Sequence, residues 1–232
     1  MSTDIPPPGS EPGAASALQI LATEHWSLLA TRSLTYTESL GRVSMFLTVL
    51  SGAVISLALV AQADRFGPTF ISVAIFMLTI VFFVGVATVR RLLMLNQDDY
   101  IWVIGMNRIR HAYLEMHPEL APNFITSPYD DLPGALQTLG LEAASAPGLG
   151  TVFHGFVTLP GMLSVIVASV GAAIAGLAAL GFGAPPFGVL LTGLAAFAIV
   201  LATMFWRGIR SFRRYGPGAE VSFPTPPKPP TS

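Results

Sequence analysis

The sequence predicts an all-α membrane protein with four transmembrane helices in two hairpins and with helical extensions on the cytoplasmic side. Hydrophobic residues make up 52% of the 232 residues, and charged residues only 11%. Four apolar stretches contain no Asp, Glu, Lys, Arg or His, and each is about as long as a helix that crosses a bilayer. Arginines gather at the ends of these stretches, as is typical of cytoplasmic flanks.

The first 42 residues are predicted to form a tail and a cytoplasmic helix. Residues 1–15 contain prolines and two acids but no apolar run, so we expect a disordered tail and not a signal peptide. Residues 16–42 have apolar side chains at helical spacing, interleaved with charged ones. Because only Gly41 interrupts the pattern, this helix is expected to enter the first span, residues 43–61, directly.

The second span, residues 70–89, follows a turn too short to hold a domain, so the two spans form an antiparallel hairpin. Apolar residues at spacings of three and four then continue from residue 90 to residue 117, which indicates an amphipathic helix. We expect one long helix that ends at His117, since the residue before a proline avoids the helical conformation. The residues of this apolar face are Trp102, Met106, Ile109, Tyr113 and Met116.

Residues 118–156 are predicted to form an irregular cytoplasmic loop, because five prolines interrupt them. One short helix is expected to begin near Asp131, which is a good N-cap and is followed by Pro133. The third span (157–182) and the fourth span (189–206) form a second hairpin. Residues 207–232 are first basic and then proline-rich, and we expect a cytoplasmic tail whose last part, from Pro217, is extended and mobile.

The arginines predict the orientation of the spans. All basic residues except Arg65 lie in segments assigned to one side, so both termini are expected in the cytoplasm. The anchors of this topology are Arg90, Arg91, Arg207 and Arg210. The excess of arginine over lysine in an Ala- and Gly-rich chain indicates a bacterial genome rich in GC, and therefore the bacterial plasma (inner) membrane.

Small and hydroxyl-bearing residues follow helical spacing in two of the spans. Ala168, Ala172 and Gly176 recur every four residues in the third span, a pattern that lets helices pack closely in lipid. Ser44, Thr48 and Ser51 share one face of the first span. They are expected either to pack and hydrogen-bond along or between helices, or to line a pore, and both alternatives stay open.

No pattern in the sequence indicates catalysis, so we do not expect an enzyme, a cofactor or a metal site. The spans lack the ionisable groups that ion-coupled transporters, proton relays and voltage sensors carry. The chain has no cysteine, which excludes disulfides and thiolate chemistry. A P-loop, a dinucleotide-binding glycine motif, HExxH and GxSxG are absent, and no basic face indicates nucleic-acid binding.

Four weaker candidates remain outside the spans. Asp98 and Asp99 are interpreted as a solvated helix face, and the pair His111 and Glu115 as an exposed contact one helical turn apart, although both sets contain metal-ligand types. His154 is interpreted as a boundary residue. The proline-rich motif at residues 224–230 could dock into an aromatic groove, but a plain tail is the preferred interpretation.

A helix of the form E-H-W-x-L-L-A-T-R-x-x-x-Y, from Glu24 to Tyr36, leads into a span, and the returning helix carries Arg90 and Arg91. This layout, over residues 17–116, resembles bacterial two-span membrane proteins of the SLATT-like and RipA-like octameric groups. The resemblance implies a ring-like homo-oligomer that acts as a pore or membrane effector. The chain departs from these groups in its second pair of spans, residues 157–206, and no functional residue carries over.

These observations together predict a non-enzymatic, self-associating membrane protein that is a pore or an effector. Its partners would be the lipid bilayer and further copies of the chain. The alternative is an accessory subunit or scaffold of a larger membrane complex, in which the loop at residues 118–150 docks on a soluble component.

Overall fold

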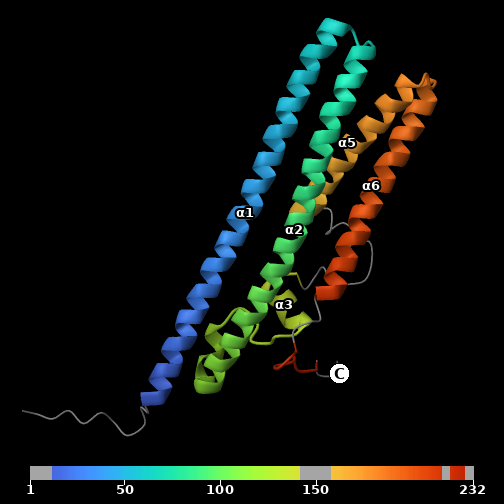
Figure 1. Ribbon diagram of the computed structural model, residues 1–232. Coiled ribbons are helices and arrows are strands. Elements are labelled where there is room, and N and C mark those ends of the chain that lie inside the picture. The colour runs from blue at the N-terminus through green and yellow to red at the C-terminus, as the bar shows by residue number, and fades with distance from the viewer. Residues whose placement is uncertain (1–11, 142–157, 216–219, 228–232) are drawn as a thin grey trace, which may run out of the picture. The chain divides into compact units, whose positions relative to one another are not determined.

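The computed structural model describes residues 12–141, 158–215 and 220–227 (Figure 1). Every regular element among these residues is a helix, which confirms the all-α class. Four helices are long and apolar enough to cross a bilayer, so the chain is a polytopic membrane protein. Residues 1–11 and 142–157, including His154, lie outside the described residues.

The first hairpin consists of α1 (Pro12–Asp64) and α2 (Pro68–Met116). Neither helix is interrupted, which confirms the expected continuity through Gly41 and the predicted stop before Pro118. The turn between them has positive φ angles at Arg65 and Phe66, and the Asp64 carboxylate accepts a hydrogen bond from the Phe70 amide at 2.7 Å. Because α1 already begins at Pro12, the predicted N-terminal tail is too long.

The second hairpin consists of α5 (Leu159–Gly181) and α6 (Pro186–Tyr215), which lie side by side (Figure 1). Thr158 caps α5 by accepting a hydrogen bond from the Gly161 amide at 3.3 Å. α6 continues well past Trp206, so the basic segment that was predicted as tail begins as helix. Arg207 and Arg210 are compatible with this continuation, since arginine is a good helix former.

The segment that follows α2 is more regular than predicted. It contains a 3₁₀ helix, η1 (Pro118–Asn123), and a short helix, α3 (Leu132–Thr138). Asp131 caps α3 by accepting a hydrogen bond from the Gly134 amide at 2.9 Å, as its position before Pro133 predicts.

The chain divides into two compact units. Unit 1 comprises the described residues among 1–35, 98–145 and 219–232, and unit 2 those among 36–97 and 146–218. Unit 2 contains all four predicted spans. Unit 1 has two small apolar clusters, one around Val103 and Ala135 and the other around Leu28 and Met106.

The core of unit 2 is tightest at Gly85 of α2. A Cβ atom there would lie 2.5 Å from Val167 Cγ2 of α5 and 2.8 Å from Phe46 Cε2 of α1, closer than atoms can approach. Phe46 and Val167 are themselves fully buried. Three helices therefore meet at a position where only glycine fits.

Candidate functional site

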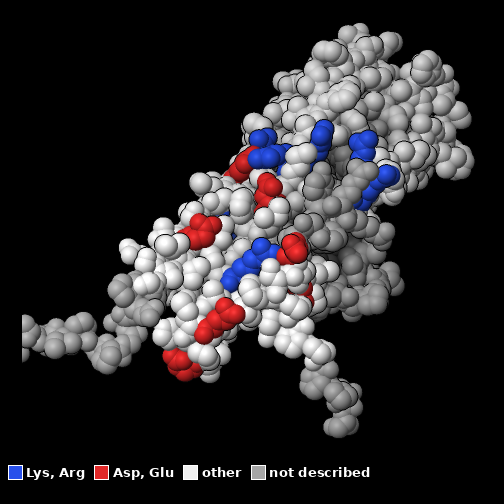
Figure 2. Space-filling model, turned by 60° about the horizontal axis from the view of Figure 1, so that its bottom comes forward, with Lys and Arg blue, Asp and Glu red and all other residues white. Residues whose placement is uncertain are grey.

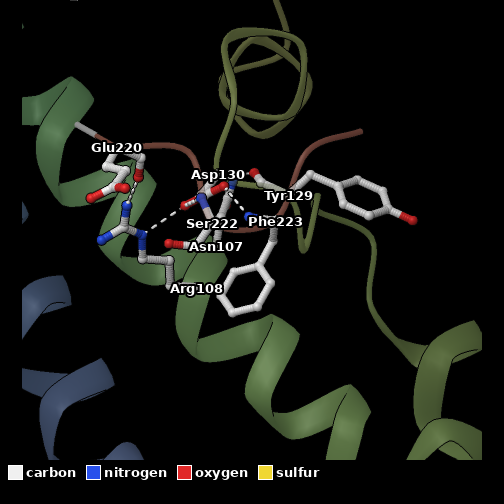
Figure 3. Close-up of polar contacts among 7 residues, drawn as sticks. All are labelled: Asn107, Arg108, Tyr129, Asp130, Glu220, Ser222 and Phe223. Carbon is white, nitrogen blue, oxygen red and sulfur yellow. Dashed lines mark hydrogen bonds and ion pairs between the residues drawn. The ribbon is translucent and has the colours of Figure 1, made fainter. Parts of the chain in front are cut away.

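The densest polar arrangement in unit 1 holds the segment 220–227 against the loop that precedes α3 (Figure 3). The carboxylate of Asp130 accepts hydrogen bonds from the amides of Ser222, at 3.0 Å, and Phe223, at 2.8 Å. The Asp130 amide in turn donates to the Phe223 carbonyl at 3.1 Å. The segment is thus bound through its backbone, and we call this arrangement the docking site.

Arg108 of α2 also contacts the Asp130 carboxylate. Its Nε donates to the Asp130 carboxylate at 2.8 Å, and its Nη2 donates to the Glu220 carbonyl. The Asp130 side chain is fully buried, whereas that of Arg108 is partly exposed. Burial works to raise the pKa of Asp130, but the two backbone amides and the guanidinium together lower the pKa below its ordinary value. Asp130 therefore binds the segment as a charged group.

The neighbouring Asp131 has two roles. It caps α3, and its carboxylate also accepts hydrogen bonds from the amide and the hydroxyl of Thr225, both at 2.7 Å. Burial works to raise the pKa of Asp131, but these hydrogen bonds outweigh it, so the pKa lies below its ordinary value. The cap was predictable from the sequence, but the contact with Thr225 was not, because the two residues are far apart in the chain.

Phe223 is the only aromatic residue of the docked segment, residues 220–227. It stacks on His111 of α2, with ring centroids 3.9 Å apart and planes at 22°. His111 Nε2 lies 3.6 Å from a carboxylate oxygen of Glu115, so the helical pair that was predicted is present, but the histidine ring is covered by the docked segment. No cluster of three metal-ligating side chains occurs among the described residues.

The loop that carries Asp130 is fixed to α2 by Asn107, which is fully buried. Its side-chain amide donates to the Tyr129 carbonyl at 2.7 Å, and its carbonyl oxygen accepts from Arg110 and from Thr138 of α3. Each polar atom of this side chain is therefore paired. Asn107 thereby attaches the loop with Asp130, and with it the docking site, to α2.

This arrangement corrects the prediction that the C-terminal tail is mobile, as far as residues 220–227 are concerned. Their amides are bound by Asp130 and Asp131, which supply the acceptors that a free tail would find in water. The prediction for Asp99 as a solvated residue is also wrong. Asp99 accepts from Arg32 Nε of α1 at 2.6 Å, and both side chains are largely buried.

The hydroxyl-bearing residues Ser44, Thr48 and Ser51 all lie on the exposed face of α1. The Thr48 hydroxyl donates to the Ser44 carbonyl at 3.0 Å, within its own helix. Gly52 and Ser56 continue the four-residue spacing; both are exposed, and the Ser56 hydroxyl donates to the Gly52 carbonyl at 2.8 Å. We call Ser44, Thr48, Gly52 and Ser56 the outer stripe of α1.

The small residues of α5 lie differently. Ala168 is fully buried. A Cβ atom on Gly193 of α6 would lie 3.5 Å from the Ala172 carbonyl, and one on Gly176 would lie 3.6 Å from Val189 of α6. Ala172 and Gly176 therefore lie where α5 and α6 of the same chain approach each other, in contrast to the outer stripe.

The predicted anchor arginines all belong to unit 2. Arg91 and Arg42 both donate to Glu38, whereas Arg90 and Arg207 are exposed. Arg210 lies over the ring of Trp206, with 5.1 Å between its Cζ and the ring centroid. Figure 2 shows arginine side chains grouped beside a region of the surface without visible charge.

The chain matches no family model, no curated protein and no solved structure. The fold and the site therefore define its class by themselves: an all-α membrane protein with a unit outside its apolar spans that holds residues 220–227 of its own chain through their backbone. The resemblance to SLATT-like and RipA-like proteins stays a prediction.

Proposed function

We propose that this protein acts without catalysis as a homo-oligomer in the bacterial inner membrane, with both termini in the cytoplasm. The α1 spans of neighbouring copies would pack through the outer stripe. The observation that carries the proposal is that this stripe faces outward, and that a Cβ atom on Gly52 would meet nothing within 4 Å. Small residues in lipid let a second helix approach closely, so an unfilled stripe favours a helix from another copy.

Exposed apolar side chains of α1 outside the predicted span support the same proposal. Trp26 is 70% exposed, and Tyr36 and Leu40 are more than half exposed. These side chains precede residue 43, where the first span is predicted to begin. Because lipid does not cover them in that topology, a contact with another copy would remove this apolar surface from water.

The mass of the full chain in mild detergent tests the proposal. We expect a defined oligomer for the unchanged chain and a shift toward monomer for Gly52→Leu, because the added side chain keeps the helices apart. Ala58→Leu is the matched control: it adds a similar side chain at an exposed position of the same span, about 120° around the helix from Gly52. A monomeric unchanged chain, or equal masses for both variants and the unchanged chain, would contradict the proposal.

The alternative use of this face is a pore, in which α1 helices of several copies surround an axis and turn Ser44, Thr48 and Ser51 toward it instead of packing them against a neighbour. The pore would be weakly selective, because it lacks a charged ring. Liposomes that contain the purified protein should then leak small ions, and Ser51→Leu should reduce the leak severalfold. If the chain assembles but the liposomes do not leak, or leak equally with Ser51→Leu, the pore is refuted. The oligomer would then act as a membrane effector that does not conduct ions.

The docking site favours a second candidate function, that of an accessory subunit or scaffold in a larger complex. The site binds an extended segment through backbone amides, which is a general mode of peptide recognition. A partner's segment would replace residues 220–227. Copurification of further subunits that is lost in Asp130→Ala supports this function, whereas a chain that purifies alone and self-assembles supports the first.

A further inference from the structure

We propose that α2 carries a binding site for one anionic phospholipid at the end of the second span. Arg90 would bind the phosphate of the headgroup, and an acyl chain would lie in the apolar groove beside it. Nothing in this proposal depends on the oligomer, since all of the residues involved belong to unit 2 of one copy.

The charges around Arg90 favour an anion. Glu38 accepts from Arg42 Nε at 2.7 Å and, through both carboxylate oxygens, from Arg91 at 2.9 and 3.0 Å. The hydrogen bonds from Arg91 and Arg42 lower the pKa of Glu38 to about 2, so this group is charged at neutral pH. Glu38 thus engages two guanidinium groups, those of Arg42 and Arg91, and Arg90 is the chain neighbour of Arg91.

Arg90 is the cation that this carboxylate does not engage. Its side chain is exposed, and no described Asp or Glu forms an ion pair with it. A guanidinium group binds a phosphate through two parallel hydrogen bonds, which makes arginine a preferred partner of phosphate groups. Arg90 is therefore free to bind an anion that the described part of the chain does not supply.

The groove next to Arg90 is apolar and suits the acyl chain of a lipid. It measures about 400 Å³ and is lined by Phe83, Val86, Ala87 and Met94 together with the two arginines, Arg90 and Arg91. Residues 83, 87, 90 and 94 follow each other at spacings of four, three and four, so they share one face of α2. Phe83 is 66% exposed. The groove thus offers apolar surface along the predicted span and positive charge where the span ends.

This combination favours a lipid over a soluble phosphate compound or a peptide. Basic side chains at the cytoplasmic end of a span are the usual contacts of anionic headgroups, and an acyl chain gains from apolar surface at that depth. A second groove in unit 2, of about 330 Å³, includes Leu93, Thr158 and Met204 but no Lys or Arg in its lining. That groove lacks the charge for a headgroup and serves as an internal comparison.

Native mass spectrometry of the purified full chain tests the site. We expect one phosphatidylglycerol per chain to stay bound under conditions that remove phosphatidylcholine with the same acyl chains. Arg90→Gln should weaken the retention of phosphatidylglycerol at least tenfold. Arg207→Gln is the matched control, because it removes an exposed arginine at the end of another span, and it should leave the retention unchanged.

A second variant tests the acyl-chain half without a change of charge. Ala87→Trp fills the groove and should reduce phosphatidylglycerol retention severalfold, and circular dichroism checks that the variants remain helical. Equal retention in Arg90→Gln and the unchanged chain would overturn the proposal, and so would an equal loss in Arg207→Gln. Displacement of the lipid by millimolar inorganic phosphate would overturn it as well, since the site would then bind phosphate and not the lipid.

Discussion

Unit 1 and unit 2 share the helices α1 and α2 but hold them by different forces. In unit 1, ion pairs and side-chain bonds to backbone groups bring distant segments together, as Asp130 does for Ser222 and Phe223. In unit 2, the contacts are mainly apolar, and a glycine lets Phe46 and Val167 approach α2. A helix in lipid gains nothing from the hydrophobic effect against lipid chains, so close packing has to take over. The comparison shows that one pair of helices can be held by polar contacts in one part of its length and by close apolar packing in another.

Among the changes that test this difference between the units, Asp130→Ala is expected to have the largest effect on stability. The change removes a buried carboxylate and leaves Arg108 and two backbone amides without their acceptor, which should cost unit 1 about 3 kcal/mol. Hydrogen exchange at Ser222 and Phe223 should become fast. Asp98→Ala is the control, since Asp98 has no hydrogen bond or ion pair in the described chain. Slow exchange at Ser222 and Phe223 in both variants would contradict the role of Asp130.

Acidification is the reversible form of the same change and should have a somewhat smaller effect, because a protonated carboxyl group still accepts one hydrogen bond. The pKa of Asp130 is lowered in the folded protein, so its contribution is fully present above the ordinary aspartate pKa and is lost as the pH falls through the folded value. Exchange at Phe223, measured at several pH values and corrected for its intrinsic rate, should accelerate only below the ordinary aspartate range. Release of the segment near pH 6 would show that another group controls it.

Gly85→Ala is expected to destabilise unit 2 by about 2 kcal/mol, because the added methyl group overlaps with Val167 and Phe46. Thermal unfolding in detergent, followed by circular dichroism, measures this loss. Gly41→Ala is the matched control: a Cβ atom there meets nothing within 4 Å, and alanine should stabilise the helix by about 0.5 kcal/mol. Similar shifts of the unfolding temperature for both variants would refute the close approach at Gly85.

The smallest expected effect is that of Asp99→Asn in unit 1. The change removes the charge that Arg32 contacts at 2.6 Å and should cost about 1 kcal/mol, since the two side chains are largely buried but keep 20% and 15% exposure to solvent. Asp98→Asn, one residue earlier, should change the free energy of unfolding by much less. High salt should reduce the difference between the two variants, and a difference that does not respond to salt would argue against an ion pair.

Local patterns predicted most of the fold. The length of the apolar stretches gave the four spans, His117 before Pro118 gave the end of α2, and Asp131 before Pro133 gave the start of α3. The two helix-boundary signals act within a few residues and depend on backbone preferences that tertiary structure did not override here. The spans follow from hydropathy over a stretch of about 20 residues.

The docking site could not be predicted in the same way, because its partners lie far apart in the chain. Asp130 binds the backbone of residues 222 and 223, and backbone amides are the same whatever side chains they carry. Phe223 resembled any apolar residue of a proline-rich tail, although it stacks on His111. Gly85 likewise looked like an ordinary small residue within a span, since the clash that excludes a larger side chain comes from two other helices.

The place of the docked segment in the chain determines the order in which the protein can be completed. Residues 220–227 follow α6, so they leave the ribosome only after all four spans have been synthesised. Until then, the carboxylate oxygens of Asp130 and the ring of His111 have no segment of their own chain to bind. Closure of unit 1 is thus a late event in biogenesis, and it can occur only once the whole membrane part has been made.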